Sequence, residues 1–219
     1  MPLVITLAHQ KGGVGKSTLA TNLRGYFVQA GYRVALVDSD PQGSLSKLTR
    51  AFADQAGRTP EHIIERGSFG SYAALEEQLR AYDVVMIDTP PYLFQELEAV
   101  LRLTHLVLVP CKASPLDFLA IGDTLNFIRE AQKSRPALLA AVVLTMTIPG
   151  TDFTTSIRRE LEKTEFPVLA TEIGNRVAYM RSLLRTDTVL GDDNRKAWGE
   201  IERLGAELIS LLKDRYDHH

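Results

Sequence analysis

Residues 9–18 read His9-Gln10-Lys11-Gly12-Gly13-Val14-Gly15-Lys16-Ser17-Thr18 and lie between two apolar segments. The run at 3–8 is typical of a buried strand, and the apolar residues after position 18 recur at helical spacing as far as Gly31. A glycine-rich turn between a strand and a helix is the setting of a phosphate-binding loop. The backbone N–H groups of such a turn and the positive end of the helix face the same anion. The stretch therefore predicts a site for a phosphorylated ligand.

The loop has an unusual form. In the common pattern G-x-x-x-x-G-K-[ST] the first glycine would stand at position 10, where this chain has Gln10. The chain instead reads K-G-G-x-G-K-[ST], which resembles the ParA/MinD superfamily of dimerising ATPases. Lys16 is expected to reach the outer phosphates and the Ser17 hydroxyl to ligate Mg²⁺. The resemblance implies ATP and Mg²⁺ as cofactors, and the residues expected to hold them are Lys11, Gly12, Gly13, Val14, Gly15, Lys16, Ser17 and Thr18.

The composition is that of an ordinary globular protein. The 219 residues are 45% hydrophobic and 24% charged, which is enough to build a buried core. No apolar run approaches the ~20 residues of a membrane span, and no signal-peptide pattern is visible at the N-terminus. The single cysteine, Cys111, fits a reducing compartment, so we expect a cytoplasmic protein. With a formal net charge of −2, any binding to nucleic acid must use a local basic patch.

Strand-like and helix-like segments alternate along the chain. This alternation predicts an α/β fold with a single domain over 1–217, built on a mostly parallel, twisted sheet with helices on both faces. His218-His219 are interpreted as a possible tag remnant. Strands are expected at 33–38, 84–88, 105–110, 140–145 and 167–173, and helices at 71–81, 116–133, 151–163 and 195–216, with a further helix start at Thr59-Pro60.

Carboxylates follow two of the predicted strands. The strand at 33–38 runs into Asp38-Ser39-Asp40-Pro41-Gln42-Gly43, and the strand at 84–88 ends in Asp88-Thr89-Pro90-Pro91. The carboxyl ends of parallel strands form the edge where open α/β sheets bind ligands. Asp88 is predicted to hold Mg²⁺ through a water, because Mg²⁺ keeps much of its hydration shell.

Both stretches are similar to ParA-family motifs. The resemblance implies that Asp40 positions or activates the attacking water and that Asp38 supports the Mg²⁺ shell. It also implies that residues 89–96 form a switch that senses the γ-phosphate. In the superfamily the adenine base lies near the end of the strand at 140–145, and Thr145-Met146-Thr147 match that pattern only in part.

Arginines are concentrated near the C-terminal third of the chain. Arg176, Arg181 and Arg185 lie in 173–185, a stretch without acids, and Arg181 and Arg185 share a helical face. Related ParA proteins hold DNA with basic residues in this region without reading its sequence, although a solvated basic face is the alternative interpretation. Arg195 and Lys196 could extend this patch, and Arg158 and Arg159 are expected to point outward from the helix at 151–163.

The resemblance as a whole implies a ParA-type ATPase that partitions plasmids or chromosomes or positions other cargo. Two subunits would meet face to face around ATP and Mg²⁺, with Lys11 crossing to the partner's phosphates. The dimer would bind DNA non-specifically on the nucleoid. A centromere-binding or cargo-adaptor protein would stimulate hydrolysis and release it. Lys11, Lys16 and Asp40 are the expected catalytic residues, and Ser17, Asp38 and Asp88 the expected metal residues.

Two other functions fit the same motifs. One is a MinD-like ATPase at a membrane surface, but the final helix at 195–216 carries glutamates on its polar face, which favours packing on the core over an anionic bilayer. The other is a P-loop ligase or kinase acting on a small molecule, which would need an organic acceptor for turnover.

Overall fold

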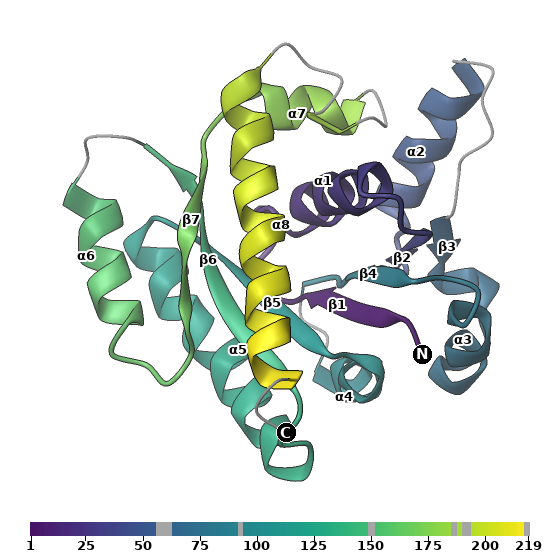
Figure 1. The fold of residues 1–219 in the computed structure, drawn as a ribbon, viewed down its shortest axis with the longest axis horizontal. Coiled ribbons are helices and arrows are strands. Elements are labelled where there is room, and N and C mark those ends of the chain that lie inside the picture. Colours follow the sequence, from purple (N-terminus) through teal and green to yellow (C-terminus); the bar gives the residue numbers. More distant parts are fainter. Residues whose placement is uncertain (56–62, 92–93, 149–151, 185–187, 190–193, 217–219) are drawn as a thin grey trace.

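The computed structural model of the protein describes residues 1–55, 63–91, 94–148, 152–184, 188–189 and 194–216. Their strands form one parallel sheet in the order β3-β2-β4-β1-β5-β6-β7 (Figure 1). A sheet with every pair parallel needs a crossover between consecutive strands, and the helices supply these crossovers. The strands are β1 (Leu3–Leu7), β2 (Val34–Asp38), β3 (Ile63–Glu65), β4 (Val84–Asp88), β5 (Leu106–Lys112), β6 (Leu139–Thr147) and β7 (Val168–Gly174).

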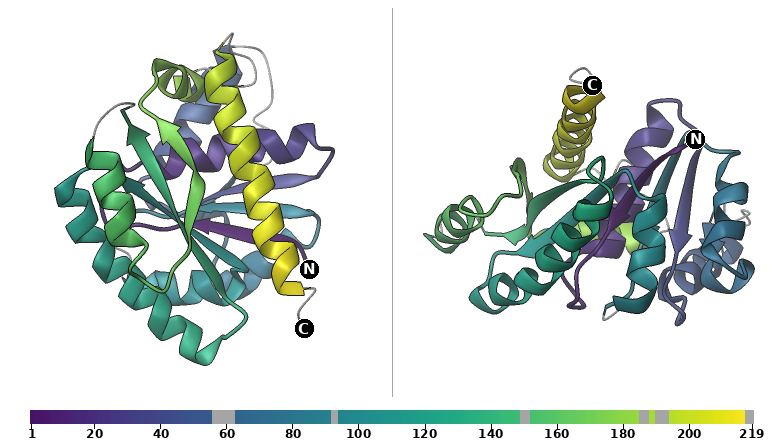
Figure 2. Two further views of the ribbon diagram at one scale, coloured as in Figure 1. Left: turned by 60° about the vertical axis from the view of Figure 1, so that its left-hand side comes forward. Right: turned by 90° about the horizontal axis from the view of Figure 1, so that it is seen from below.

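Helices cover both faces of the sheet (Figure 2). Helices α1 (Lys16–Gln29), α2 (Ser44–Gln55), α7 (Val177–Leu184) and α8 (Arg195–Tyr216) lie on one face. Helices α3 (Tyr72–Leu79), α4 (Phe94–Leu103), α5 (Pro115–Ser134) and α6 (Asp152–Leu161) lie on the other. The α/β fold with a parallel sheet and helices on both faces is confirmed.

The alternation of side chains along each strand divides the core between the two faces. In β4, Val84 and Met86 pack beneath α1 and α8, whereas Val85 and Ile87 pack beneath α3 and α4. All four are at most 3% exposed. Because both faces of β4 are buried, this strand is apolar up to its last residue, Asp88.

The structure contains elements that the sequence pattern did not predict, namely helices α2 and α4 and the strand β3. The strand β3 was not expected, because it has only three residues, all of them half-buried at the edge of the sheet. The helix start at Thr59-Pro60 lies outside the described residues. The other expected strands are present, and those expected at 105–110, 140–145 and 167–173 end one or two residues further than the pattern indicated, while the helices at 71–81 and 151–163 are shorter than expected.

The edge strand β7 contains a bulge. Val142 pairs with Val168 and Leu144 pairs with Glu172, so three β7 residues stand opposite one of β6. The carboxylate of Glu207 on α8 accepts the backbone N–H groups of Ala170 and Thr171, at 2.5 and 3.0 Å. Helix α8 thus binds the irregular part of the edge strand.

Helix α6 binds the same bulge from its other side. Arg158 donates to the carbonyl of Leu169 at 3.0 Å and pairs with Glu172 at 3.0 Å. The expectation that Arg158 points outward into solvent is therefore wrong, because its guanidinium satisfies a carbonyl that the bulge removes from the sheet.

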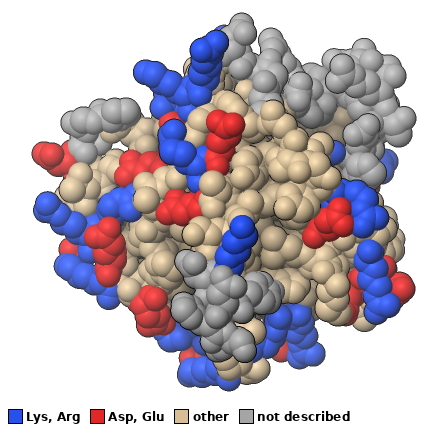
Figure 3. Space-filling model, in the orientation of Figure 1, with Lys and Arg blue, Asp and Glu red and all other residues tan. Residues whose placement is uncertain are grey.

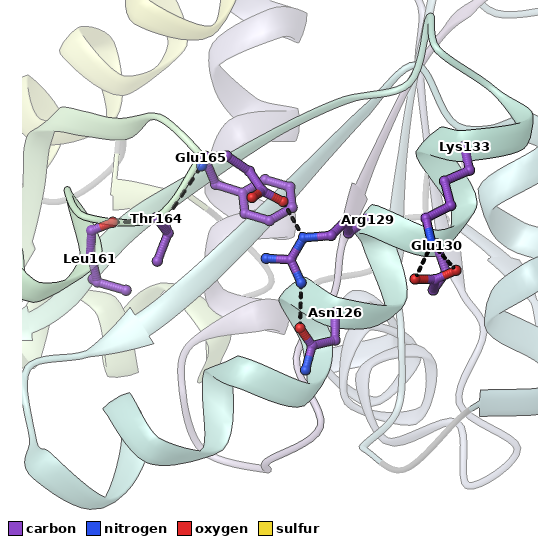
Figure 4. Close-up of polar contacts among 8 residues, drawn as sticks. Asn126, Arg129, Glu130, Lys133, Leu161, Thr164 and Glu165 are labelled. Atoms are coloured by element: carbon purple, nitrogen blue, oxygen red, sulfur yellow. Dashed lines mark hydrogen bonds and ion pairs between the residues drawn. The ribbon is translucent and has the colours of Figure 1, made fainter.

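Side-chain contacts join helix α5 to the segment that leads into β7. Arg129 pairs with Glu165 and bonds Asn126, and one turn on, Lys133 pairs with Glu130 (Figure 4). The Arg129 guanidinium also lies 5.9 Å from the ring centroid of Phe166. These side chains are largely exposed, so their contribution to stability is small.

Candidate nucleotide-binding site

The glycine-rich stretch forms a loop between β1 and α1. Gly13 and Gly15 have φ of 74° and 101°, a conformation that a side chain would strain, and Gly15 is the N-cap of α1. Lys16 is the first residue of the helix and is only 7% exposed. Its Nζ donates to the carbonyls of His9 at 3.1 Å and Lys11 at 2.9 Å, so the lysine folds back across its own loop.

Lys16 lies close to two of the predicted carboxylates. Burial lowers the pKa of its ammonium group, while the negative charges of Asp88 and Asp40 oppose that shift. The helix start and the ends of β2 and β4 thus bring one cation and two anions together at the carboxyl edge of the sheet, where the sequence predicted them.

Asp88 has the strongest signature of a metal site. The carboxyl group is 5% exposed and its Oδ1 has no hydrogen-bond partner, while the Ser17 hydroxyl bonds the carboxylate. Burial raises the pKa of Asp88 to about 7, opposed by the Ser17 bond and by Lys16. An unpaired buried carboxylate oxygen beside a hydroxyl fits Mg²⁺, which takes hard oxygen ligands and completes its shell with water and phosphate oxygens. When bound, the ion neutralises charge on those phosphates.

The protein supplies only part of a metal shell at this edge of the sheet. Among the described residues no three His, Cys, Asp or Glu side chains gather into a metal cage. One carboxylate and one hydroxyl would leave most of the shell of a bound Mg²⁺ to water and phosphate oxygens.

Asp38 is engaged by the protein itself. Its Oδ2 accepts the backbone N–H and the hydroxyl of Ser46, both at 2.8 Å, and its Oδ1 accepts the N–H of Asp40 at 3.2 Å. Asp38 stands beside Asp88 in the sheet and is 1% exposed. It thus anchors the first turn of α2 next to the metal residues, and direct support of Mg²⁺ stays a prediction.

Asp40 lies in the turn that follows β2 and is half-buried. Its Oδ1 accepts the N–H of Gln42 at 2.8 Å, which leaves Oδ2 for another donor. Ser39 ties this turn to the neighbouring strand, because its N–H and its hydroxyl both donate to the Asp88 carbonyl, at 3.0 and 2.8 Å. The carboxylate predicted to orient water is therefore held close to the one predicted to hold Mg²⁺.

Lys11 points in a different direction from Lys16. Its Nζ donates to the carbonyl of Leu116 at 2.6 Å and lies 3.6 Å from Asp117 at the start of α5. Its backbone N–H donates to Nδ1 of the buried His9 at 2.9 Å. Burial and the Lys16 charge lower the pKa of His9 to about 4, so this ring nitrogen stays an acceptor at neutral pH.

Beside the loop lies a cavity of about 230 Å³ that the sequence pattern did not reveal. Thr145 forms part of its wall and donates to the carbonyl of Val14 at 2.9 Å, which joins β6 to the loop. Met146 has φ of 52°, an uncommon conformation for a residue other than glycine. The cavity is lined by Gly15, Thr18, Leu19, Thr145, Met146, Ile173, Gly174, Asn175, Arg176, Tyr179 and Met180.

The three arginines predicted to bind DNA are in different situations. Arg176 pairs with the buried Glu200, with Nε 2.9 Å from the carboxylate, and only 26% of its side chain is exposed. It lines the cavity and would have to leave this pair to contact DNA. Arg181 is exposed on α7, and Arg185 lies outside the described residues. Lys and Arg side chains gather over the N-terminal end of α8 (Figure 3), where Arg195, Lys196 and Arg203 are exposed.

The sequence matches the CobQ/CobB/MinD/ParA nucleotide-binding domain over residues 5–189, most of the chain. The chain belongs to this family. Its loop from 11 to 18 and the carboxylates of Asp40 and Asp88 lie at the carboxyl edge of the sheet, the edge where open α/β sheets bind ligands.

Relatives within the family include proteins that distribute cellular cargo. The chain is 32% identical over 209 residues to maintenance of carboxysome distribution protein A of Halothiobacillus neapolitanus, covering 94% of this chain and 95% of the relative. It is 32% identical over 171 residues to the chromosome-partitioning ATPase Soj of Thermus thermophilus, covering 64% of this chain and 68% of Soj.

Solved structures of the family have the same fold. An ATP complex of McdA from Cyanothece superposes with a TM-score of 0.75 at 16% identity, covering 94% of this chain and 96% of the other. MinD of Pyrococcus horikoshii, solved with Mg-ADP, gives a TM-score of 0.71 at 15% identity, covering 98% and 99%. These likenesses confirm the P-loop fold.

Proposed function

We propose that this protein is a ParA-type ATPase that forms a face-to-face dimer on ATP and Mg²⁺, binds DNA without reading sequence, and hydrolyses ATP to position a plasmid, chromosome or other cargo. Its relatives that distribute carboxysomes and partition chromosomes support this class of function. An adaptor protein on the cargo would stimulate hydrolysis and release the dimer from DNA.

The observation that carries the proposal is the opposite orientation of the two loop lysines. Lys16 is turned into the loop, where one nucleotide would need its charge, whereas Lys11 reaches out of the loop to α5. Next to Lys11, Leu116 and Leu119 are 71% and 74% exposed. The loop does not use the charge of Lys11, and the leucines beside Lys11 are apolar and exposed. Such a surface suits contact with a second copy of the chain.

The remaining residues have roles in hydrolysis that follow from their positions. Ser17 and Asp88 would hold Mg²⁺, and Lys16 would neutralise the β- and γ-phosphates. Asp40, with one carboxylate oxygen available and Lys16 nearby, would orient the attacking water. Phosphoryl transfer to water needs such positioning and charge neutralisation and no covalent intermediate.

Light scattering in the presence of Mg-ATP tests the dimer. Asp40→Ala is expected to bind ATP, cleave it very slowly and accumulate as a dimer, because the ATP state persists. Lys11→Ala is expected to bind ATP and stay monomeric. Lys133→Ala, which removes an exposed lysine from the far end of α5, is the matched control and should behave as wild type. A Lys11→Ala protein that dimerises normally on ATP would contradict the face-to-face arrangement.

The DNA surface is expected at Arg181 and the N-terminal end of α8. Arg181→Glu combined with Arg195→Glu and Lys196→Glu should weaken binding equally for unrelated DNA sequences and leave ATP affinity intact. Binding of wild type should also fall steeply as salt increases, through loss of counterion release. Arg129→Glu with Lys133→Glu on α5 changes charge elsewhere and should leave DNA binding unchanged. Equal DNA binding by the triple variant and wild type would place the DNA site elsewhere.

The two other candidate functions find less support. The apolar side chains of α8 pack on the core, with Ile201, Leu204 and Leu208 at 0% exposure, so this helix offers a bilayer little apolar surface. Among the described residues, no helix is long and apolar enough to cross a membrane. A ligase or kinase would require an organic acceptor for turnover, whereas we expect ATP hydrolysis without one.

A further inference from the structure

Asn22 is a fully buried amide on α1, the helix that begins in the glycine-rich loop. Its Nδ2 donates to the carbonyl of Thr18 at 2.8 Å and to the hydroxyl of Ser182 at 3.2 Å. Its Oδ1 accepts the N–H of Val189 at 2.8 Å. Both hydrogens of the amide are thus used. One side chain of α1 therefore holds α7, on which Ser182 lies, and also the chain at 188–189.

The contact between α1 and α7 (Figure 1) is close and excludes water. Ser182 is buried, and its hydroxyl donates its own hydrogen to the carbonyl of Tyr179 at 2.9 Å, so it serves Asn22 as an acceptor. Nearly one turn further along α1, a side chain at Gly25 would collide with Thr188. Removing the amide would leave buried polar groups without partners, which favours this single arrangement of α7 on α1.

The position of Ser182 determines where its neighbour Arg181 points. Successive residues of a helix are about 100° apart around its axis. With Ala178 and Ser182 buried against the protein, Arg181 faces solvent. Contacts to DNA phosphates depend on the register and orientation in which a protein presents its cations. The bond from Asn22 therefore fixes the base from which Arg181 extends.

We propose that Asn22 is a positioning residue for DNA binding, which sets α7 so that Arg181 meets the phosphate backbone. This inference rests on the proposed function, because it requires the ATP-bound protein to hold DNA. Asn22 is buried and acts through Arg181 without touching DNA. An amide suits this place because one short side chain supplies two donors and an acceptor, whereas a carboxylate would lack both donors.

Two variants remove the bond between α1 and α7. Asn22→Ala deletes the amide, and Ser182→Ala is milder because it deletes a single hydroxyl. With Mg²⁺ and a non-hydrolysable ATP analogue, each is expected to bind a random-sequence duplex about tenfold more weakly than wild type, roughly the loss of one charge-assisted hydrogen bond. Calorimetry without DNA should give an unchanged affinity for Mg-ATP.

Two readouts separate positioning from a general loss of stability. The plot of log DNA affinity against log salt concentration should become shallower by about one, as it should for Arg181→Ala, because one phosphate contact is lost. In a double-mutant cycle, Asn22→Ala should have no further effect on DNA affinity once Arg181→Ala is present. A residue that only stabilises the fold would lower the affinity equally in both backgrounds.

Thr104→Val is the matched control. Thr104 is also fully buried, and its hydroxyl bonds the hydroxyl of Thr6 and the carbonyl of Val100, just before the amino end of β5. The variant should lower the melting temperature, because it breaks a buried hydrogen bond. It should leave the DNA affinity and its salt dependence unchanged.

The possible results have distinct meanings. Additive losses in Asn22→Ala and Arg181→Ala, or an unchanged salt dependence in Asn22→Ala and Ser182→Ala, would overturn the positioning role. If Asn22→Ala does not fold, the cycle between Ser182→Ala and Arg181→Ala decides in the same way. A wild-type protein that binds Mg-ATP but no DNA at low salt would instead refute the proposed function, and this inference with it.

Discussion

The two ends of the candidate site differ in how the chain builds them and in how well their polar groups are satisfied. The phosphate end comes from one loop and the carboxylates that end two adjacent strands, and it contains a buried carboxylate oxygen of Asp88 without a partner. The cavity end, beside the loop, is assembled from β6, β7, α7 and α8, and the carboxylate of Glu200 has donors on both oxygens. The first end is incomplete without its ligand, whereas the second is already organised. Binding energy should therefore come mainly from charge at one end and from shape and hydrogen bonding at the other.

The largest effect is expected from Lys16→Ala at the phosphate end. Removing the one ammonium group buried in the loop should lower Mg-ATP affinity by roughly a hundredfold or more, since charged pairs in buried sites are worth the most. Calorimetry measures this loss. Lys47→Ala, an exposed cation on α2, is the control and should bind ATP normally. If Lys16→Ala bound ATP as wild type does, the phosphate end would not depend on charge, and the expected difference between the two ends of the site would be contradicted.

A second effect follows from the buried carboxyl group of Asp88. Its folded-state pKa of about 7 lies above the ordinary value of 3.8, so between pH 4 and 7 the unfolded chain releases a proton that the folded chain keeps. Stability is therefore lost as pH rises through this window, by on the order of 4 kcal/mol. Asp88→Asn should raise the melting temperature of the nucleotide-free protein by roughly 5 °C at pH 8 and little at pH 4. The same variant should lose Mg²⁺-dependent ATP affinity.

Asp83 provides a control of opposite sign. It is an exposed carboxylate whose bonds to Arg33 lower its pKa to about 2, so its contribution is present above pH 4 and is lost as pH falls toward 2. Asp83→Asn should slightly lower the melting temperature at pH 8. A destabilised Asp88→Asn protein at pH 8 would show that the phosphate end carries no unfavourable charge.

The smallest effect is expected away from both ends. Arg129→Ala removes an exposed ion pair to Glu165 and a cation–π contact with Phe166 (Figure 4), which should lower the free energy of unfolding in urea by less than about 1 kcal/mol. The ATP affinity and the ATP-to-GTP ratio should both stay at their wild-type values. A change in the ATP-to-GTP ratio or in the ATP affinity would mean that α5 influences the site, and the comparison of its two ends would be incomplete.

The phosphate end could be predicted from the sequence because its parts are short and contiguous. The loop from 11 to 18 carries its own pattern, and each carboxylate directly follows an apolar run, so topology alone brings Asp40 and Asp88 to one edge. The roles of Lys11, Asp38 and Asp40 in catalysis and metal binding stay predictions.

The cavity end could not be predicted in this way, because Asn175 and Glu200 belong to segments without a periodic or motif signal that joins them. The position of Arg176 shows the same limit. The stretch 173–185 that contains it has no acid, yet folding brings Glu200 from α8 onto its guanidinium. Charge counted along the sequence does not reveal this ion pair, since pairing across the fold is decided by helix packing. The short strand β3 could not be predicted for a related reason, because its three half-buried residues show no periodicity.

The bulged edge of the sheet has a consequence for how molecules of this protein meet. An exposed edge strand can recruit a strand from a neighbouring chain and so begin an ordered aggregate. In β7, the N–H groups of Ala170 and Thr171 are bound by Glu207 and the carbonyl of Leu169 by Arg158, so these three groups are not available to a neighbouring strand. A protein that crowds onto DNA at high local density, as we propose, would be protected at this edge against growing into fibrils.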